Sequence, residues 1–459
     1  MTQVVVVGGG IAGLAAALRL ASAGVAVTLV ESTAAVGGKL RISEVAGVAV
    51  DEGAEMFLRR VPEALSLVDA LGRSAELVSP QSTSASLWSR GELHPMPTGT
   101  VMGLPSDPAT LRGVLSAAEV ARVTLDRFLP GTAPGEDISV GDWVRRRVGA
   151  AVADRLVDPL LGGVYAGRAD HLSLAATIPQ LPRDERSLLA AAGRAIPAVP
   201  STEPVFATVT GGMGSLPASV AGAIESAGGV IVTGRAVRRL ERTEVAGWRV
   251  VHGPTTDEQP IEADAVILAL PAAPAARLLA GIARIAATEL AAIEAASMAI
   301  VTTAWRCDDV PATTSSGYLV PATYRRPVKA VTFASSKWAH VGGDDVAIVR
   351  CSIGRHGDVG DLQRDDADLA AAAAAELTTY AGFHGVPIES RVTRWGGALP
   401  QYAVGHPDRV ARIRASVAEV PGLAACGATY DGVGVPACIR SAHRAVAEVL
   451  AGLSSRESR

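Results

Sequence analysis

The chain opens with a run of apolar residues that is broken only by glycine. Residues 4–7 are all valine, residues 8–13 form a glycine-rich turn, and residues 14–21 are an alanine- and leucine-rich run of helical length. A short β-branched run bounded by glycine is typical of a buried strand, and the longer run is typical of a helix. The sequence therefore predicts strand, tight turn and helix at its start, with a second strand at residues 25–30.

Beyond this unit, stretches of helical periodicity alternate with short apolar runs. The region from 108 to 195 is predicted to be mainly helical, with the clearest amphipathic runs at 111–128 and 140–148 and a glycine-rich interruption at 162–167. Short strands are expected in two groups, at residues 229–233, 236–240, 248–251 and 265–270, and at residues 299–305, 317–320, 329–333 and 347–352. Helices are also expected at 63–72, 365–380 and 437–450, and a frayed polar tail at 454–459.

The opening glycine turn has the spacing of a dinucleotide-binding motif. Gly8 allows a turn that needs no Cβ, Gly10 allows close approach to a pyrophosphate, and Gly13 allows tight packing of helix on strand. Glu31 ends the second strand, where a carboxylate can accept hydrogen bonds from both ribose hydroxyls of an adenosine. A purely structural glycine turn is the alternative. It is disfavoured because the strand, the helix and the acidic residue all follow at the spacing of a dinucleotide-binding motif.

Two further glycine loops favour a longer cofactor. Gly37, Gly38 and Lys39 are suited to a second pass over the pyrophosphate, with Lys39 or Arg41 offsetting its charge, although a solvated loop is the alternative. Because a cofactor held by a second loop is longer than NAD requires, these residues point to FAD. Near the other end of the chain, the N–H groups of Val433 to Val435 could face the pyrimidine carbonyls of a flavin.

Composition and charge narrow the class of protein. A length of 459 residues suggests two or three domains, and a net charge of −4 offers no general attraction for nucleic acid. No secretory signal or long apolar stretch stands out, so a cytoplasmic protein is expected. The four cysteines show neither CxxC spacing nor adjacent histidines, which predicts reduced thiols and no metal site. The basic run from Arg145 to Arg147 is expected on a solvated helix face.

These motifs together resemble one family. The chain is similar to the FAD-dependent porphyrinogen oxidases of haem synthesis, within the amine-oxidase-like flavoprotein group. Beyond the opening turn, the resemblance rests on residues 53–57, 163–174, 211–216, 317–321, 329–338, 394–406 and 430–436. The last three stretches are the most particular, and they look like the bacterial coproporphyrinogen III oxidases.

The resemblance implies a fold of mixed class, α/β and α+β. It implies a Rossmann-like FAD-binding domain built from discontinuous segments, a mixed β-sheet substrate domain and a helical subdomain. The expected boundaries are 1–78, 201–285 and 396–453 for the FAD-binding domain, 79–107 and 286–395 for the substrate domain, 108–200 for the helical subdomain, and 454–459 for a disordered tail.

The resemblance also assigns site residues by position. Those implied at FAD are Gly8, Gly9, Gly10, Ile11, Ala12, Gly13, Glu31, Ser32, Lys39, Gly53, Ala54, Glu55 and Met56, with Val237 beside the adenine, Trp395 near the isoalloxazine, and Val433, Gly434 and Val435 at the flavin carbonyl edge. Candidate substrate contacts are Arg59, Arg60, Arg168, Lys337 and His406. Lys39 stands where relatives often have arginine, which keeps the charge but loses the bidentate fork. Arg59 and Arg60 replace a more usual Arg-Lys pair and could equally be a solvated helix start.

The implied activity is a six-electron oxidation of coproporphyrinogen III to coproporphyrin III. Hydride would pass to flavin N5 in three rounds, with reoxidation by molecular oxygen giving hydrogen peroxide, so no catalytic side chain is expected. The runner-up substrate is protoporphyrinogen IX. Other amine-oxidase-like enzymes, such as an amine oxidase or a carotenoid desaturase, and a non-catalytic flavin- or porphyrin-binding protein are the remaining alternatives. A ferrochelatase-type downstream enzyme is an expected partner, and peripheral membrane contact is left open.

Overall fold

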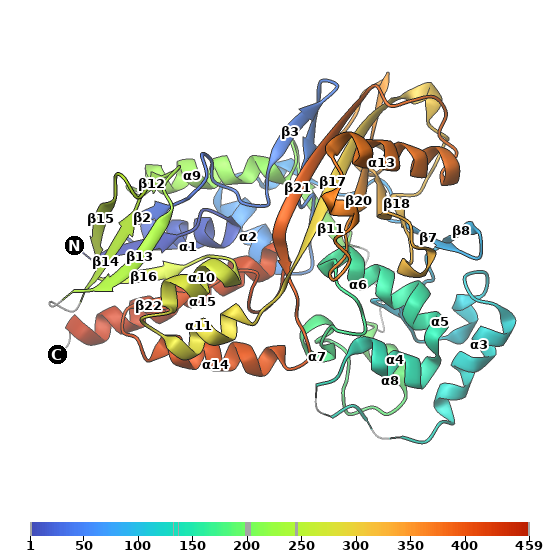
Figure 1. Cartoon of the computed structure of the whole chain (residues 1–459), viewed down its shortest axis with the longest axis horizontal. Helices are drawn as coiled ribbons and strands as arrows, with labels where there is room; N and C mark the ends of the chain where they lie inside the picture. Colours follow the sequence, from blue (N-terminus) through green and yellow to red (C-terminus); the bar gives the residue numbers. More distant parts are fainter. Residues whose placement is uncertain (1, 132, 136, 198–202, 244–246, 458–459) are drawn as a thin grey trace.

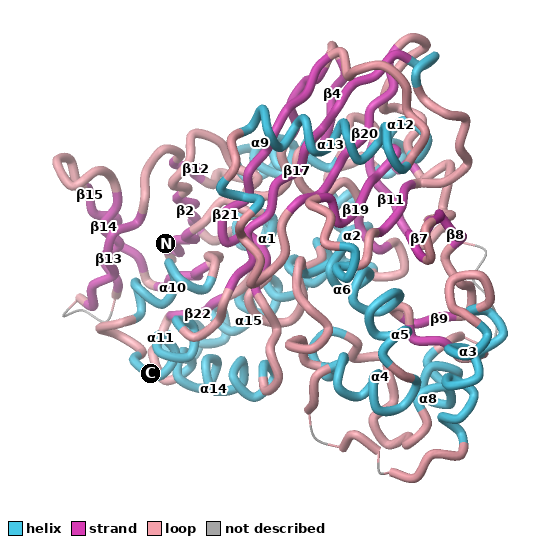
Figure 2. The backbone as a smooth tube through the Cα atoms, turned by 45° about the vertical axis from the view of Figure 1, so that its right-hand side comes forward, coloured by secondary structure: helices cyan, strands magenta, loops and turns pink. Residues whose placement is uncertain are grey.

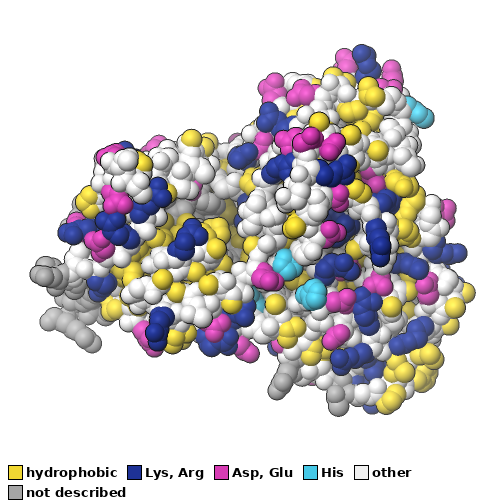
Figure 3. All heavy atoms as spheres, in the orientation of Figure 1, with side chains coloured by type: hydrophobic (Ala, Val, Ile, Leu, Met, Phe, Trp, Pro, Cys, Tyr) yellow, Lys and Arg dark blue, Asp and Glu magenta, His cyan; other side chains and the backbone are white. Residues whose placement is uncertain are grey.

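The computed structural model describes residues 2–131, 133–135, 137–197, 203–243 and 247–457. Three groups of elements make up the chain: an α/β unit, a long mixed sheet, and a cluster of short helices (Figure 1). On the face shown in Figure 3, Lys and Arg side chains are interspersed with Asp and Glu side chains. Within the described residues, no helix is long and apolar enough to cross a membrane.

The α/β unit is built on a five-stranded parallel sheet. Its strand order is β12 (Val230–Val232), β2 (Ala26–Val30), β1 (Gln3–Val7), β16 (Ala265–Leu268) and β22 (Leu423–Ala425). Val4 and Val6 face one core with helices α1 (Ile11–Ser22), α9 (Leu216–Ser226) and α15 (Val435–Glu457). Val5 and Val7 face a second core. A strand buried on both faces needs an unbroken apolar run, which explains the four valines.

The second core of this unit is closed by shorter elements from the middle and end of the chain. These are the antiparallel strands β13 (Val237–Arg242), β14 (Trp248–His252) and β15 (Gln259–Ala263), and the helices α10 (Ala272–Leu279), α11 (Arg284–Ala291) and α14 (His406–Ala418). The α/β unit therefore draws on separated segments of the sequence, and the predicted fold class with a discontinuous Rossmann-like unit is confirmed. The residue boundaries of the domains stay a prediction.

A seven-stranded mixed sheet forms the second group. Its order is β21 (Glu389–Pro400), β17 (Ala295–Arg306), β20 (Val346–Ile353), β19 (Val328–Phe333), β18 (Gly317–Leu319), β7 (Ser86–Ser89) and β8 (Glu92–Pro95), and only the β18–β7 pair is parallel. Helix α13 (Asp366–Tyr380) packs on one face. The smaller elements of these two groups are β3 (Ile42–Val45), β4 (Val48–Asp51), β5 (Phe57–Leu58), β6 (Leu77–Val78), β11 (Phe206–Val209), α2 (Pro62–Ala70) and α12 (Ala334–Lys337).

The third group is a helical cluster with its own apolar core. It contains α3 (Ala117–Thr124), α4 (Val140–Val148), α5 (Ala150–Val152), α6 (Asp158–Tyr165), α7 (Leu174–Thr177) and α8 (Leu188–Ala195), with the short strands β9 (Thr100–Val101) and β10 (Leu104–Pro105) beside it. In the turned view of Figure 2 most of these helices lie together below strands β7 and β8.

Several helix boundaries differ from the predicted ones. The run at 111–128 becomes α-helical only at Ala117, because Ser116 and Glu119 form a capping box there. Gly162 and Gly163 lie inside α6, and the interruption predicted at 162–167 begins only at Ala166, whose left-handed backbone ends this helix. Helix α15 continues to Glu457, through residues for which the sequence predicts a frayed tail.

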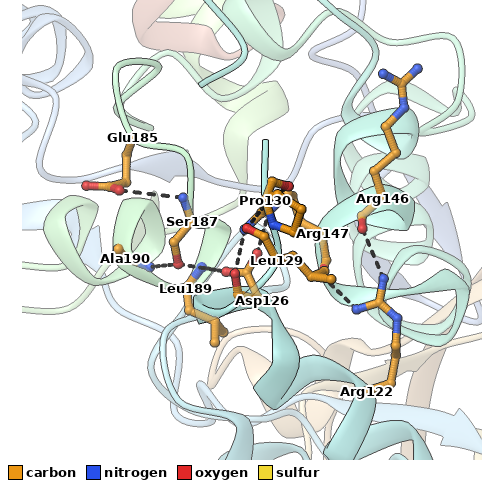
Figure 4. A network of polar contacts seen from close by, with 10 residues as sticks. All are labelled: Arg122, Asp126, Leu129, Pro130, Arg146, Arg147, Glu185, Ser187, Leu189 and Ala190. Atoms are coloured by element: carbon orange, nitrogen blue, oxygen red, sulfur yellow. Dashed lines mark hydrogen bonds and ion pairs between the residues drawn. The ribbon is translucent and has the colours of Figure 1, made fainter. Parts of the chain in front are cut away.

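The basic run in α4 also differs from its prediction. Arg146 is exposed, but Arg147 is 5% exposed and its Nε lies 2.6 Å from Asp126 Oδ1 (Figure 4). Asp126 also accepts hydrogen bonds from Ser187 Oγ and from the Leu189 N–H. The prediction of a solvated helix face is therefore wrong for Arg147. Its ion pair with Asp126, which in turn accepts from Ser187 and Leu189, holds α4 against the start of α8. A helical period places i and i+1 on different faces, so one basic run can contain both a surface and an interior residue.

Candidate functional site

The glycine turn between β1 and α1 serves two separate purposes. A Cβ on Gly13 would lie 1.8 Å from Gly8 O, and a Cβ on Gly8, whose φ is +106°, would lie 2.5 Å from Ala269 O. The chain's own packing therefore requires glycine at both positions. A Cβ on Gly10 would meet no protein atom within 4 Å. Gly10 faces open space, as expected of a residue beside a ligand cradle.

The start of α1 presents unpaired donors beside that space. The N–H groups of Gly10, Ile11, Ala12 and Gly13 have no acceptor within the part of the chain that the structure describes. Helices α3, α4 and α8 begin instead with serine side chains that cap their first turn. A helix N-terminus without a side-chain cap leaves its donors and dipole available to an anion.

Glu31 lies where the sequence places it, at the carboxyl end of β2. Its carboxylate accepts hydrogen bonds from the Gly9 N–H at 2.6 Å, the Thr33 N–H at 2.7 Å and Ser32 Oγ at 3.1 Å. The segment before Val237 runs alongside, because the Arg235 N–H donates to Glu31 O. The structure therefore brings Glu31, Ser32 and the start of β13 to one edge of the glycine turn.

The second glycine loop lies directly on the first. The Gly37 N–H donates to Gly9 O at 2.7 Å, and a Cβ on Gly38 would lie 3.2 Å from the Gly10 Cα. Of the two candidate cations here, Arg41 is paired with Glu52 at 2.6 Å. Lys39 is half-buried beside Cys438 of α15, its Nζ has no hydrogen-bond or ion-pair partner among the described residues, and burial lowers its pKa. Lys39 is therefore the cation left to meet an anionic group.

The chain's last glycine loop joins the same site from the opposite end of the sequence. A Cβ on Gly427 would lie 3.9 Å from the Ala12 Cβ, which places this loop against the start of α1. The N–H groups of Val433, Gly434 and Val435 have no acceptor in the described ranges, so the start of α15 also presents free donors. Two uncapped helix N-termini therefore belong to one site.

Tyr402 holds this last loop in place. Its Oη donates to Ala428 O at 2.5 Å and accepts a hydrogen bond from the Gly432 N–H at 2.8 Å. His406 stacks on the Tyr402 ring with centroids 4.0 Å apart, and its Nε2 lies 3.1 Å from Tyr430 O. His406 is 3% exposed and burial lowers its pKa. In this structure His406 therefore supports the loop, and its predicted contact with substrate stays a prediction.

Residues 53–56 meet the long sheet through a buried charge cluster. Glu55 lies 2.5 Å from Lys337 Nζ and 2.6 Å from Arg350 Nη1, and Arg350 also donates to Gly53 O. Burial raises the pKa of Glu55, but the two cations outweigh it and the value lies at about 2. Lys337, expected at the substrate, is thus paired with Glu55, which it shares with Arg350. A Cβ on Gly53 would lie 3.3 Å from Trp395 Cζ2, so these two predicted residues are neighbours.

The other candidate substrate cations differ in their partners. Arg59 pairs with Glu203 at 3.2 Å, and Arg168 pairs with Asp158 at the same distance. Arg60 is exposed and has no ion pair among the described residues. The sequence alone did not identify Arg350 or Tyr402 as part of the site. A charged residue within the apolar run at 347–352 was the available signal for Arg350.

Comparison with known proteins gives concordant matches. The family profile described as "Flavin containing amine oxidoreductase" matches residues 11–450. A protein of Mycobacterium tuberculosis H37Rv named coproporphyrinogen III oxidase is 39% identical over 99% of this chain and 98% of its own length. A protein of the same name from Bacillus subtilis strain 168 is 31% identical over 99% of both chains. A crystal structure of a protein from Exiguobacterium sp. 255-15 superposes with a TM-score of 0.85 at 29% identity, over 99% of both chains.

Proposed function

The chain belongs to the flavin-containing amine oxidoreductase family, and from this premise we propose that it is an FAD-dependent coproporphyrinogen III oxidase. The observation that carries the substrate is the full-length identity of 39% and 31% to two relatives of that name. Membership makes the chain a flavin-containing oxidoreductase. Protoporphyrinogen IX is the alternative substrate, because it has the same macrocycle with fewer propionates.

The geometry of the cradle supports FAD as the flavin. The free donors at the start of α1, the open space at Gly10 and the unpartnered Lys39 suit a pyrophosphate. The adenosine end would be held by Glu31 and Val237. The ring end would be held by Trp395 and the segment from Val433 to Val435. A flavin without the adenosine half would leave Glu31 and the β13 edge unused.

When bound in this cradle, FAD would supply the oxidation, and three rounds of hydride removal from the macrocycle would account for its six electrons. Oxygen is the final acceptor, so three O2 become three H2O2. The protein binds and orients both partners. The N–H groups of Val433, Gly434 and Val435, at the positive end of the α15 dipole, would stabilise negative charge on the carbonyl edge of the ring. We assign no side chain as a proton acceptor.

A direct test measures porphyrin fluorescence from the two porphyrinogens side by side with the purified holoprotein. We expect oxygen-dependent oxidation of both, with a higher kcat/KM for coproporphyrinogen III. A higher kcat/KM for protoporphyrinogen IX would reverse the substrate assignment. Anaerobic mixing with substrate should bleach the flavin absorbance, and persistent absorbance would instead identify a non-catalytic binding protein.

Arg60 is the candidate cation left without an ion pair, so we expect Arg60→Ala to raise KM for coproporphyrinogen III by about 3- to 10-fold. An exposed charge contact is worth about 1 kcal/mol or less, which corresponds to a change of at most about 5-fold, so the increase should lie near the lower end of this range. The increase should be smaller for protoporphyrinogen IX, which carries two propionates instead of four. Steady-state kinetics with both substrates provides the measurement. Arg59→Ala is the matched control, because Glu203 already holds Arg59, and equal effects on both substrates would count against the role of Arg60.

Tyr402→Phe is expected to loosen the chain's last glycine loop, which contains Gly427 and Gly432. The change leaves the Ala428 carbonyl and the Gly432 N–H without their hydroxyl partner, at a cost of about 1–3 kcal/mol. We expect faster FAD release and a lower unfolding temperature of the holoprotein. Tyr430→Phe is the control, because the buried Tyr430 hydroxyl has no hydrogen-bond partner among the described residues. Similar losses in both variants would contradict a specific role for the Tyr402 hydroxyl.

A further inference from the structure

Residues 52–55 lie between the second glycine loop and the long sheet. On the side of the glycine loop, the Ala54 N–H donates to Lys39 O at 3.3 Å. A Cβ on Gly53 would lie 2.0 Å from the same oxygen, so the two stretches of backbone are in direct contact. The position of Lys39, the cation left to meet an anionic group in the proposed cradle, therefore depends on where residues 52–55 are held.

On the opposite side, the long sheet holds this segment by its carbonyl groups and its one paired carboxylate. Trp395 Nε1, on β21, donates to Glu52 O at 3.1 Å. Arg350, on β20, donates through Nη2 to Gly53 O at 2.7 Å and through Nη1 to Glu55 Oε2 at 2.6 Å. One planar guanidinium thus fixes two groups of the segment at once, which the point charge of a lysine cannot do in the same geometry.

Charge balance alone does not explain Arg350. Lys337 already pairs with the other carboxylate oxygen of Glu55 at 2.5 Å, and the three side chains are all buried. The neighbouring carboxylate, Asp51, accepts instead from two backbone N–H groups before α9. Buried pairs are screened little by solvent, so this cluster is a firm attachment. What Arg350 adds to the Lys337 pair is the second hydrogen bond, to Gly53 O, and this bond acts on the backbone that touches the glycine loop.

We propose that Arg350 is a positioning residue for the cofactor, which fixes residues 52–55 and through them the backbone of Lys39. The long sheet thereby contributes to cofactor affinity through the α/β unit. A cation that is already held in place loses less conformational freedom when an anion binds, so the anion binds more tightly. The inference rests on the proposed function only in taking FAD as the cofactor, and it does not depend on the substrate.

The first test is hydrogen–deuterium exchange of the FAD-free protein, followed by mass spectrometry. Arg350→Met should speed exchange in the peptides that cover residues 37–41 and 52–55, because the Ala54 N–H loses its fixed partner. Arg355→Met is the matched control. Arg355 is equally buried just beyond the same strand, but it donates to Val320 O and not to this segment. The control should leave exchange at 37–41 unchanged, and unchanged exchange there in Arg350→Met would overturn the proposal.

The second test measures FAD affinity by quenching of flavin fluorescence. Arg350→Met and Lys39→Met should each weaken binding by about tenfold or more. The double variant should bind within about twofold of Lys39→Met alone, because residues that act through one contact are not additive. Arg350→Lys should bind more like Arg350→Met than like the unaltered chain, since it restores the charge but not the fork. Additive losses, full rescue by lysine, or normal binding by Lys39→Met would each overturn the proposal.

If Arg350→Met does not fold, Arg350→Lys replaces it in the exchange measurement, because its charge keeps the pair with Glu55. Exchange at 37–41 should rise in this variant too, and unchanged exchange would overturn the proposal. Neither test uses a porphyrinogen. An unaltered chain that binds FAD but oxidises no porphyrinogen would refute the proposed function and leave the role of Arg350 standing. An Arg350→Met protein that binds FAD as tightly as the unaltered chain would refute this role and leave the proposed function standing.

Discussion

Replacing Arg147 with alanine is expected to destabilise the protein by about 3–5 kcal/mol, because it removes one partner of a buried ion pair and leaves the other charged. Arg147 and Asp126 have side chains 7% and 0% exposed. Arg147 also donates to the backbone oxygens of Asp126, Leu129 and Pro130, so these three oxygens and the Asp126 carboxylate lose a donor. The expected result is a large fall in the unfolding midpoint of the holoprotein, measured by urea titration followed by circular dichroism.

Arg146→Ala provides the matched control one position earlier in the same helix. Arg146 has a side chain that is 74% exposed and a 3.5 Å contact with Asp142. Its removal should change the midpoint little, since exposed pairs contribute little stability. If the two variants unfold at the same denaturant concentration, the network around Asp126 does not stabilise the helical cluster as its burial implies.

Gly10→Ala is expected to abolish most FAD binding without unfolding the chain. The added Cβ meets no protein atom within 4 Å, so the FAD-free protein should keep its stability. The same methyl group would occupy the space where the backbone is expected to approach the pyrophosphate. We expect FAD affinity to fall by at least about tenfold, corresponding to about 1.4 kcal/mol or more, measured by quenching of flavin fluorescence on titration of the FAD-free protein.

Gly222→Ala is the control for this change. Gly222 lies in α9, and a Cβ there also meets no atom within 4 Å. The substitution should leave FAD affinity unchanged and stabilise the helix by about 0.5–1 kcal/mol. A Gly10→Ala protein that binds FAD normally, or one whose FAD-free form is itself unfolded, would show that Gly10 serves the turn and not the ligand.

The local pattern of apolar residues and glycines was sufficient to predict much of the fold. The four valines, the glycine turn and the run after it predict β1 and α1 because each of these elements depends on neighbours in the sequence. The same holds for α4, whose predicted bounds agree with the structure. The pattern failed where a single side chain decides a boundary, as Ser116 does for α3.

The charge pairs of the site could not be predicted in this way. Glu55 meets Lys337 and Arg350 across separations of 282 and 295 residues, and no local period records which distant strand will lie opposite. Tyr402 reaches Gly432 only because the end of β21 passes beside the last glycine loop. Resemblance to a family can suggest that such residues belong to a site, but the pairing itself depends on how the two sheets meet.

The order of strands in the parallel sheet has a consequence for the synthesis of the protein. Strand β22 pairs with β16 and comes after the other four strands of this sheet in the sequence, so the sheet is complete only once the segment between β16 and β22 has been synthesised. Until then, the edge of β16 is uncovered and the donors at the start of α15 do not yet exist. A growing chain can therefore display its opening glycine turn early but can close the proposed cofactor cradle only after the start of α15 has been synthesised. Chains that terminate early would carry an open strand edge, which favours aggregation and removal.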